Sequence, residues 1–89
     1  MKVEFSEFVL IFANSGFIHL GLVPNPISGQ AEKNLPAAQH TIDTLTMLQE
    51  KTKNNLTKEE DDLLSRFLHE LRMGYISQSR QSDSPAGRE

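Results

Sequence analysis

The sequence has no cysteine, no tryptophan and a single tyrosine, and its 89 residues allow only one small domain. Without cysteine the chain can form neither a disulfide nor a thiolate zinc site, which are common supports of domains of this size. A short domain also buries a small share of its surface on folding. Its stability must therefore depend on very good packing or on association with another chain.

The chain also has fewer positive than negative side chains: Lys and Arg number 9, Asp and Glu number 12, and the net charge is -3. A chain of this charge has no electrostatic attraction to a phosphate backbone, so nucleic acid is not an expected partner. The lack of cysteine suits a reducing compartment, and we expect a cytoplasmic protein.

One apolar run, over residues 8–23, raises the question of a membrane span or a signal peptide. The run falls short of the roughly 20 apolar residues that a spanning helix needs. It is also a poor signal peptide, because Glu4 and Glu7 lie where positive charge belongs and no small-residue cleavage site precedes Pro24. Polar side chains interrupt the run at Asn14, Ser15 and His19. We therefore expect neither secretion nor a membrane span.

The same run predicts a helix over residues 6–20, with Ser6 as N-cap and Gly21 as the left-handed residue that follows its end. This helix is hydrophobic on nearly every side. Its main face is predicted to hold Phe5, Phe8, Val9, Phe12 and Leu20, and its flanks hold Leu10, Ile11, Phe17 and Ile18. Such a helix is either central to a larger core or buried against a partner, so the pattern predicts self-association.

A second helix is predicted over residues 35–53, after a loop at 22–33 that is rich in Pro, Gly, Asn and Ser. Asn34 can cap its first amides, and Pro36 is tolerated in the first turn because its missing N–H needs no partner there. Asn54 can adopt the left-handed conformation that ends a helix. The predicted core-facing stripe is Ala38, Thr41, Ile42, Leu45, Leu48 and Thr52.

A third helix is predicted over residues 58–76, starting with a capping box in which Thr57 and Glu60 each satisfy a backbone amide of the other. The acidic first turn matches the helix dipole, and without ligands at calcium-loop spacing we assign it no metal. Residues 77–89 are rich in Ser, Gln, Pro and Gly and are predicted to form a disordered tail. The predicted apolar arc is Leu63, Leu64, Phe67, Leu68, Leu71 and Tyr75.

The sequence offers little for catalysis, because His19, His40 and His69 fall on three different predicted helices. His40 and Asp43 have a spacing at which a carboxylate can orient an imidazole, but such pairs are common by chance. We interpret His19 as a hydrogen-bonded core side chain and the other two as surface residues. No phosphate-binding glycine loop, HExxH or GxSxG motif is present. We therefore expect no enzyme activity, and no catalytic residue, cofactor or metal.

Met73 and Ile76 lie outside the predicted arc of the third helix. They either complete a contact surface with the first helix or are isolated exposed side chains, which are common in proteins. Asn14 interrupts the first helix and, if that helix self-associates, can pair across the interface and fix its register. The interface candidates are therefore Phe8, Leu10, Ile11, Asn14, Phe17, Ile18, Met73 and Ile76.

Several blocks of the sequence resemble one known family. They are FxxFVLxF from Phe5, then HLG, then NLPAAxxxIDTLxMLxEKT, NLTKEE and LxELRMxY, which ends at Tyr75. In this order they are similar to the small bacterial domain-of-unknown-function 1844 family. The resemblance supports a three-helix domain and implies no activity, cofactor or catalytic residue. The family commonly has Gly in the turn where this chain has Asn54, a change that still permits a left-handed turn.

The sequence thus predicts an all-α fold, a small three-helix domain over residues 1–76 that forms a homo-oligomer, followed by a disordered tail at 77–89. The expected function is a non-enzymatic protein-interaction or assembly module acting through apolar helix surfaces, with another copy or a different protein as partner. The alternative is a peripheral membrane or signal-anchor protein that uses the first helix.

Overall fold

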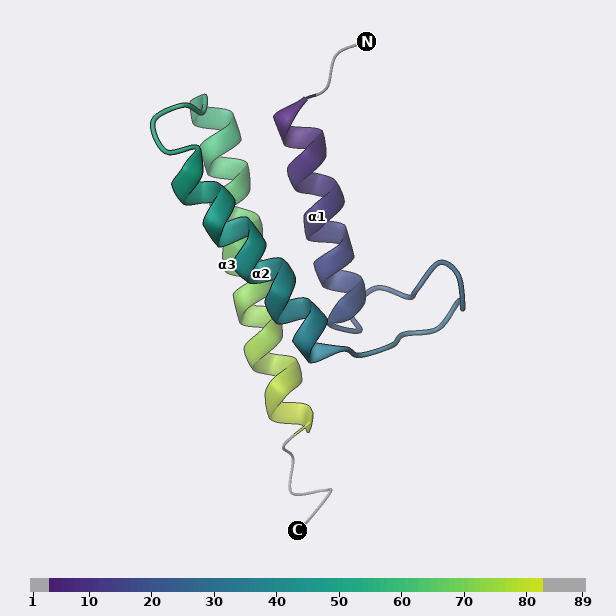
Figure 1. The fold of residues 1–89 in the computed structure, drawn as a ribbon. Coiled ribbons are helices and arrows are strands. Elements are labelled where there is room, and N and C mark those ends of the chain that lie inside the picture. Colours follow the sequence, from purple (N-terminus) through teal and green to yellow (C-terminus); the bar gives the residue numbers. More distant parts are fainter. Residues whose placement is uncertain (1–3, 83–89) are drawn as a thin grey trace.

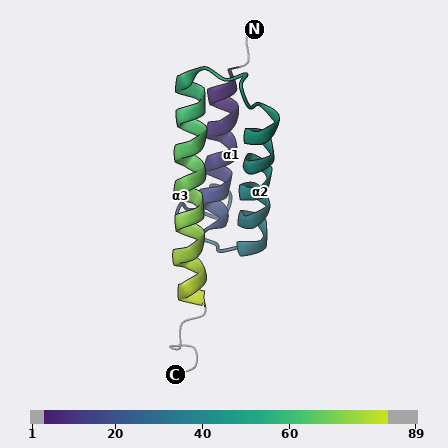
Figure 2. The ribbon, with the colours of Figure 1, turned by 90° about the vertical axis from the view of Figure 1, so that its left-hand side faces the viewer.

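The computed structural model describes the backbone of residues 4–82 and the side chains of residues 4–80. Three helices make up this part of the chain: α1 (Phe5–His19), α2 (Leu35–Lys51) and α3 (Lys58–Ser82). Each helix packs against both others, and α2 runs antiparallel to α1 and α3 (Figures 1 and 2). The described part contains no strand, which confirms the predicted all-α fold.

The start of α1 differs from the prediction that Ser6 is its N-cap. The helix begins at Phe5, and the N-cap is Glu4, whose backbone is extended and whose side chain makes no capping hydrogen bond. Ser6 lies within the first turn instead. The earlier start allows Phe5 to pack against the hydrophobic core, and this burial is a contact that the local capping pattern does not reveal.

The end of α1 is held by a left-handed glycine, as predicted. Gly21 has a φ of 79°, and its N–H donates to the Ile18 carbonyl at 2.9 Å. The Leu22 N–H donates to the Phe17 carbonyl at 3.0 Å. These two bonds form a Schellman motif, which satisfies carbonyls that the helix itself leaves without a donor.

The predicted caps of the other two helices are also confirmed. The Asn34 side chain accepts from the Ala37 N–H at 3.1 Å, and Asn54 has a φ of 70°. Thr57 Oγ1 accepts from the Glu60 N–H at 3.1 Å, while the Glu60 carboxylate accepts from the Thr57 N–H at 2.9 Å. The end of α2 at Lys51 falls two residues before the predicted end at 53.

The core lies between the three helices, and its α1 side includes the small residues Ala13 and Gly16. A methyl group added to Gly16 would lie 2.7 Å from Leu71 Cδ2 and 3.1 Å from Thr41 Cγ2, so the helices approach closely at this glycine. Phe8, which the sequence places on the main core face, is 41% exposed instead. The buried hydrophobic residues are Val9, Ala13, Leu20, Ala38, Ile42, Leu45, Leu64, Leu68 and Leu71.

The third helix is longer than predicted, because it continues to Ser82 rather than ending at residue 76 (Figure 1). Gln78 explains the extension: it is buried, and its Nε2 donates to the Leu20 carbonyl at the end of α1. Lys33 Nζ donates in turn to the Gln78 carbonyl at 3.2 Å. Residues 77–82 are therefore helical, and residues 83–89 of the predicted tail lie outside the described residues.

Candidate interaction surface

The three histidines lie on three different helices. His40 and His69 are exposed, as predicted, and His19 is half-buried with its Nε2 3.4 Å from Ser15 Oγ. The Asp43 carboxylate accepts from Gln39 Nε2 at 2.9 Å, within its own helix. Among the residues that the structure describes, no three His, Asp or Glu side chains gather as a metal site would require.

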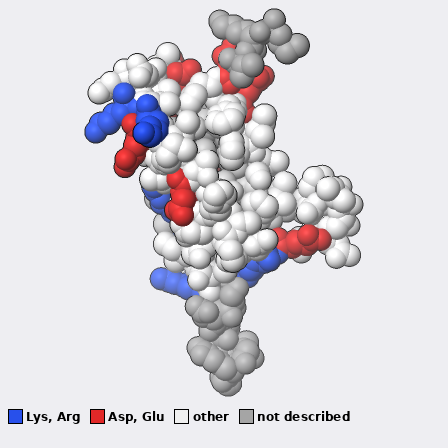
Figure 3. All heavy atoms as spheres, viewed as in Figure 1, with Lys and Arg blue, Asp and Glu red and all other residues white. Residues whose placement is uncertain are grey.

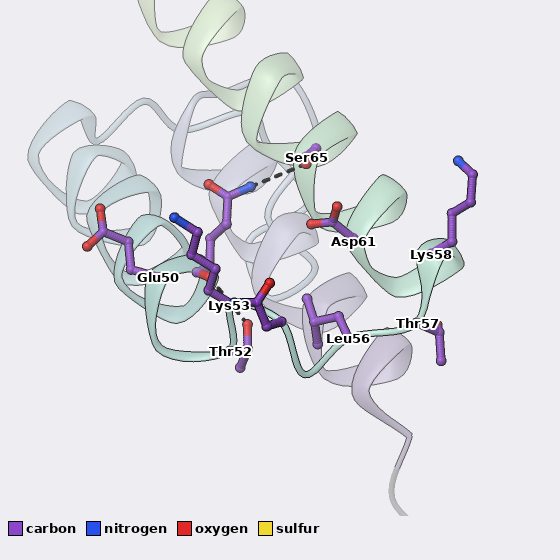
Figure 4. A pocket seen from close by; sticks show the side chains of 10 residues that line it. Glu50, Thr52, Lys53, Leu56, Thr57, Lys58, Asp61 and Ser65 are labelled. Atoms are coloured by element: carbon purple, nitrogen blue, oxygen red, sulfur yellow. Dashed lines mark hydrogen bonds between the residues drawn. The ribbon is translucent and has the colours of Figure 1, made fainter.

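One hollow lies at the turn between α2 and α3 and has a volume of about 820 Å³ (Figure 4). Its lining includes both acidic and basic side chains, namely Glu50, Lys53, Lys58 and Asp61. In Figure 4, Glu50 and Lys58 extend from opposite sides of the turn and do not converge. A mixed set of solvent-facing charges is typical of a hydrated turn, so we assign it no ligand.

The outward face of α1 is a different kind of surface, because it is apolar. Since α1 turns Val9, Ala13, Gly16 and Leu20 into the core, helical spacing directs Leu10, Ile11 and Asn14 outward. Leu10 is 51% exposed and Ile11 is 69% exposed. The surface over α1 in Figure 3 carries few charged atoms between its two ends. We call Phe8, Leu10, Ile11, Asn14 and Ile18 the outer α1 face.

A hollow of about 590 Å³ lies on the outer α1 face. It is lined by Ser6, Glu7, Leu10, Ile11 and Asn14, all from α1. In the sequence, Glu7 served only as evidence against a signal peptide and was not among the interface candidates. Glu7 stands 3, 4 and 7 residues before Leu10, Ile11 and Asn14, and this helical spacing is the sequence signal that places it beside them.

The other interface candidates lie in different parts of the bundle. Phe17 and Ile18 are half-buried, and the Phe17 ring meets the Phe67 ring edge to face with centroids 6.3 Å apart. Phe67 therefore lies on the flank of α3 that faces α1. Ile76 instead lines a shallow depression between α2 and α3, and Met73 is 53% exposed. The structure thus groups five of the candidates on the outer α1 face, turns Phe17 toward α3 and places Ile76 away from them.

The architecture is that of a small antiparallel three-helix bundle with an apolar face left open on its first helix. The chain belongs to the family described as a domain of unknown function, DUF1844, whose profile matches residues 2–77. This confirms the resemblance seen in the sequence blocks. No curated protein and no solved structure matches the chain significantly.

Proposed function

We propose that this protein is a non-enzymatic assembly module that forms a homo-oligomer through the outer α1 face. The carrying observation is that Phe8, Leu10 and Ile11 stay exposed, at 41%, 51% and 69%, although the bundle has closed around its core. Within the described residues, every buried side-chain nitrogen or oxygen has a hydrogen-bond partner. The fold is thus complete without this face, and contiguous exposed apolar groups are typical of interaction sites.

A second copy of the chain suits this face better than a lipid surface does. Helices that lie in a membrane interface combine an apolar face with flanking Lys and Arg, which attract anionic headgroups. Here acidic Glu4 and Glu7 lie at the N-terminal end of α1, and Asn14 lies in the middle of the outer face. None of the helices within residues 4–82 has the length and hydropathy to cross a membrane.

We also propose that the protein has no enzyme activity and that it is cytoplasmic. The separation of His19, His40 and His69 on three helices supports a non-enzymatic role, because acid–base chemistry needs groups that converge on one substrate atom. A cysteine-free chain suits a reducing cytoplasm.

Light scattering of the purified full-length protein, across a concentration series and without detergent, tests the proposal. We expect a dimer or higher oligomer. The variant Ile11→Asp buries a charge in each copy of the interface and should raise the dissociation constant by about 100-fold or more. Met47→Asp is the matched control, because Met47 is 50% exposed on α2 and lies outside the outer α1 face.

Two results would overturn the proposal. The first is a wild-type monomer at every concentration, and the second is an oligomer that Ile11→Asp and Met47→Asp affect equally. Far-UV circular dichroism of each variant checks that its helices are intact. A wild-type monomer that floats with lipid vesicles would support the peripheral membrane alternative instead.

A further inference from the structure

The outer α1 face has the geometry of a helix-packing site. Glu7, Leu10, Ile11 and Asn14 are spaced at i, i+3, i+4 and i+7, and these four residues, together with Ser6, line the hollow of about 590 Å³. Four residues at this spacing form the hole that receives one side chain of a facing helix in knobs-into-holes packing. The hollow therefore fits a single apolar side chain from another helix.

The outer α1 face continues toward the C-terminal end of α1. Leu10 stands four positions before Asn14, and Ile18 stands four positions after it. Ile11 stands three positions before Asn14, and its counterpart Phe17, three positions after, packs against Phe67 of α3. A pattern that reads alike in both directions is self-complementary in an antiparallel pair, and twofold dimers use the same patch on both subunits.

We propose that two copies of the chain pair α1 against α1 in antiparallel orientation, about a twofold axis at Asn14. The inference rests on the proposed function, and it names the partner and the register. In this pairing Ile18 of the second copy enters the hollow formed by the first copy, and the reverse insertion occurs at the other end. The two Asn14 amides meet at the axis, where each side chain has both a donor and an acceptor to offer the other.

Charge decides between the antiparallel and the parallel orientation. Glu7 lines the hollow seven residues before Asn14, so a parallel pair would bring the two Glu7 carboxylates together. An antiparallel pair places the two Glu7 residues at opposite ends of the interface. The like charges are thus separated.

The helix dipoles also favour the antiparallel orientation. Antiparallel pairing places the N-terminal end of one α1 beside the C-terminal end of the other, so the opposite partial charges of the helix ends attract each other. Figure 3 shows acidic atoms at the N-terminal end of α1 and both acidic and basic atoms near its C-terminal end.

Single cysteines in this cysteine-free chain can test the orientation by disulfide formation under mild oxidation. A disulfide needs Cα atoms less than about 7 Å apart. In the antiparallel pair Leu10 of one copy lies level with Ile18 of the other, while the two Leu10 residues are separated by about 12 Å along the helix axis. The parallel pair reverses both distances.

We expect Asn14→Cys to cross-link with itself, and Leu10→Cys to cross-link with Ile18→Cys in an equimolar mixture. Leu10→Cys alone should give at least about tenfold less cross-linked dimer than that mixture. Met47→Cys serves as the control for random collisions. Light scattering of each variant under reducing conditions checks that it still associates.

The outcomes separate the two proposals. Self-cross-linking of Leu10→Cys without cross-linking in the mixture shows a parallel pair, and overturns the antiparallel inference while assembly through α1 stands. An oligomer that cross-links at none of these positions overturns the inference as well. A wild-type monomer in light scattering overturns both proposals together.

Discussion

Replacing Gly16 with alanine tests how closely the three helices approach one another. In an exposed helix interior this change stabilises by about 1 kcal/mol, because glycine has more conformational freedom to lose on folding. In the bundle, the new methyl group would lie 2.7 Å from Leu71 Cδ2 and 3.1 Å from Thr41 Cγ2. Leu71 is fully buried, so its side chain cannot move into solvent to relieve the contact.

Overpacking of this kind costs typically about 1–3 kcal/mol. With the helix-propensity gain of about 1 kcal/mol subtracted, Gly16→Ala should lower the free energy of unfolding by about 1 kcal/mol. Gly74→Ala in α3 is the matched control. Its methyl group would lie 3.0 Å from Cδ1 of the buried Leu20, which is a looser contact than the 2.7 Å at Gly16, and 3.2 Å from Cδ1 of Leu22, which is half exposed and able to shift.

We expect Gly74→Ala to leave the free energy of unfolding unchanged or to raise it by up to about 1 kcal/mol. The measurement is urea unfolding followed by far-UV circular dichroism, with every variant at the same protein concentration, because association makes stability depend on concentration. If Gly16→Ala stabilises the protein as much as Gly74→Ala does, the close approach at Gly16 is refuted.

Two further predictions concern helix ends. Gln78→Ala removes the donor to the Leu20 carbonyl and should lower the free energy of unfolding by about 1–3 kcal/mol. Amide hydrogen exchange at the end of α3 should become faster than in the control Ser77→Ala, because Ser77 is exposed. Equal exchange rates in the two variants would contradict the role of Gln78 in extending α3. Thr57→Ala removes the acceptor for the Glu60 N–H and should destabilise the protein by about 1 kcal/mol in thermal unfolding. Thr57→Ser keeps a hydroxyl acceptor and should retain wild-type stability. A Thr57→Ala variant with the wild-type melting temperature would contradict the role of Thr57 as N-cap.

The helix ends that sequence reasoning predicted well are those fixed by neighbouring residues. The caps at Asn34 and Thr57 and the left-handed turns at Gly21 and Asn54 all depend on groups within a few positions along the chain. Such interactions can be predicted from sequence because the partner lies close to the residue it satisfies.

Two of the ends that were predicted wrongly depend on distant contacts. α1 starts one residue early because Phe5 joins the core, and α3 extends to Ser82 because Gln78 bonds to Leu20, which lies 58 positions away. The composition after residue 76 is polar, so local reasoning predicted disorder there. One buried side chain with a remote acceptor was enough to keep the helix ordered through residue 82.

The sequence by itself determined that the chain forms three helices and that the first one carries more apolar side chains than one face can hold. It also placed Leu10, Ile11 and Asn14 among the interface candidates. Only the tertiary structure decided which side of that helix faces outward. The core took the side with Ala13 and Gly16 because helices can approach closely only where side chains are small, and this choice left Phe8, Leu10 and Ile11 exposed.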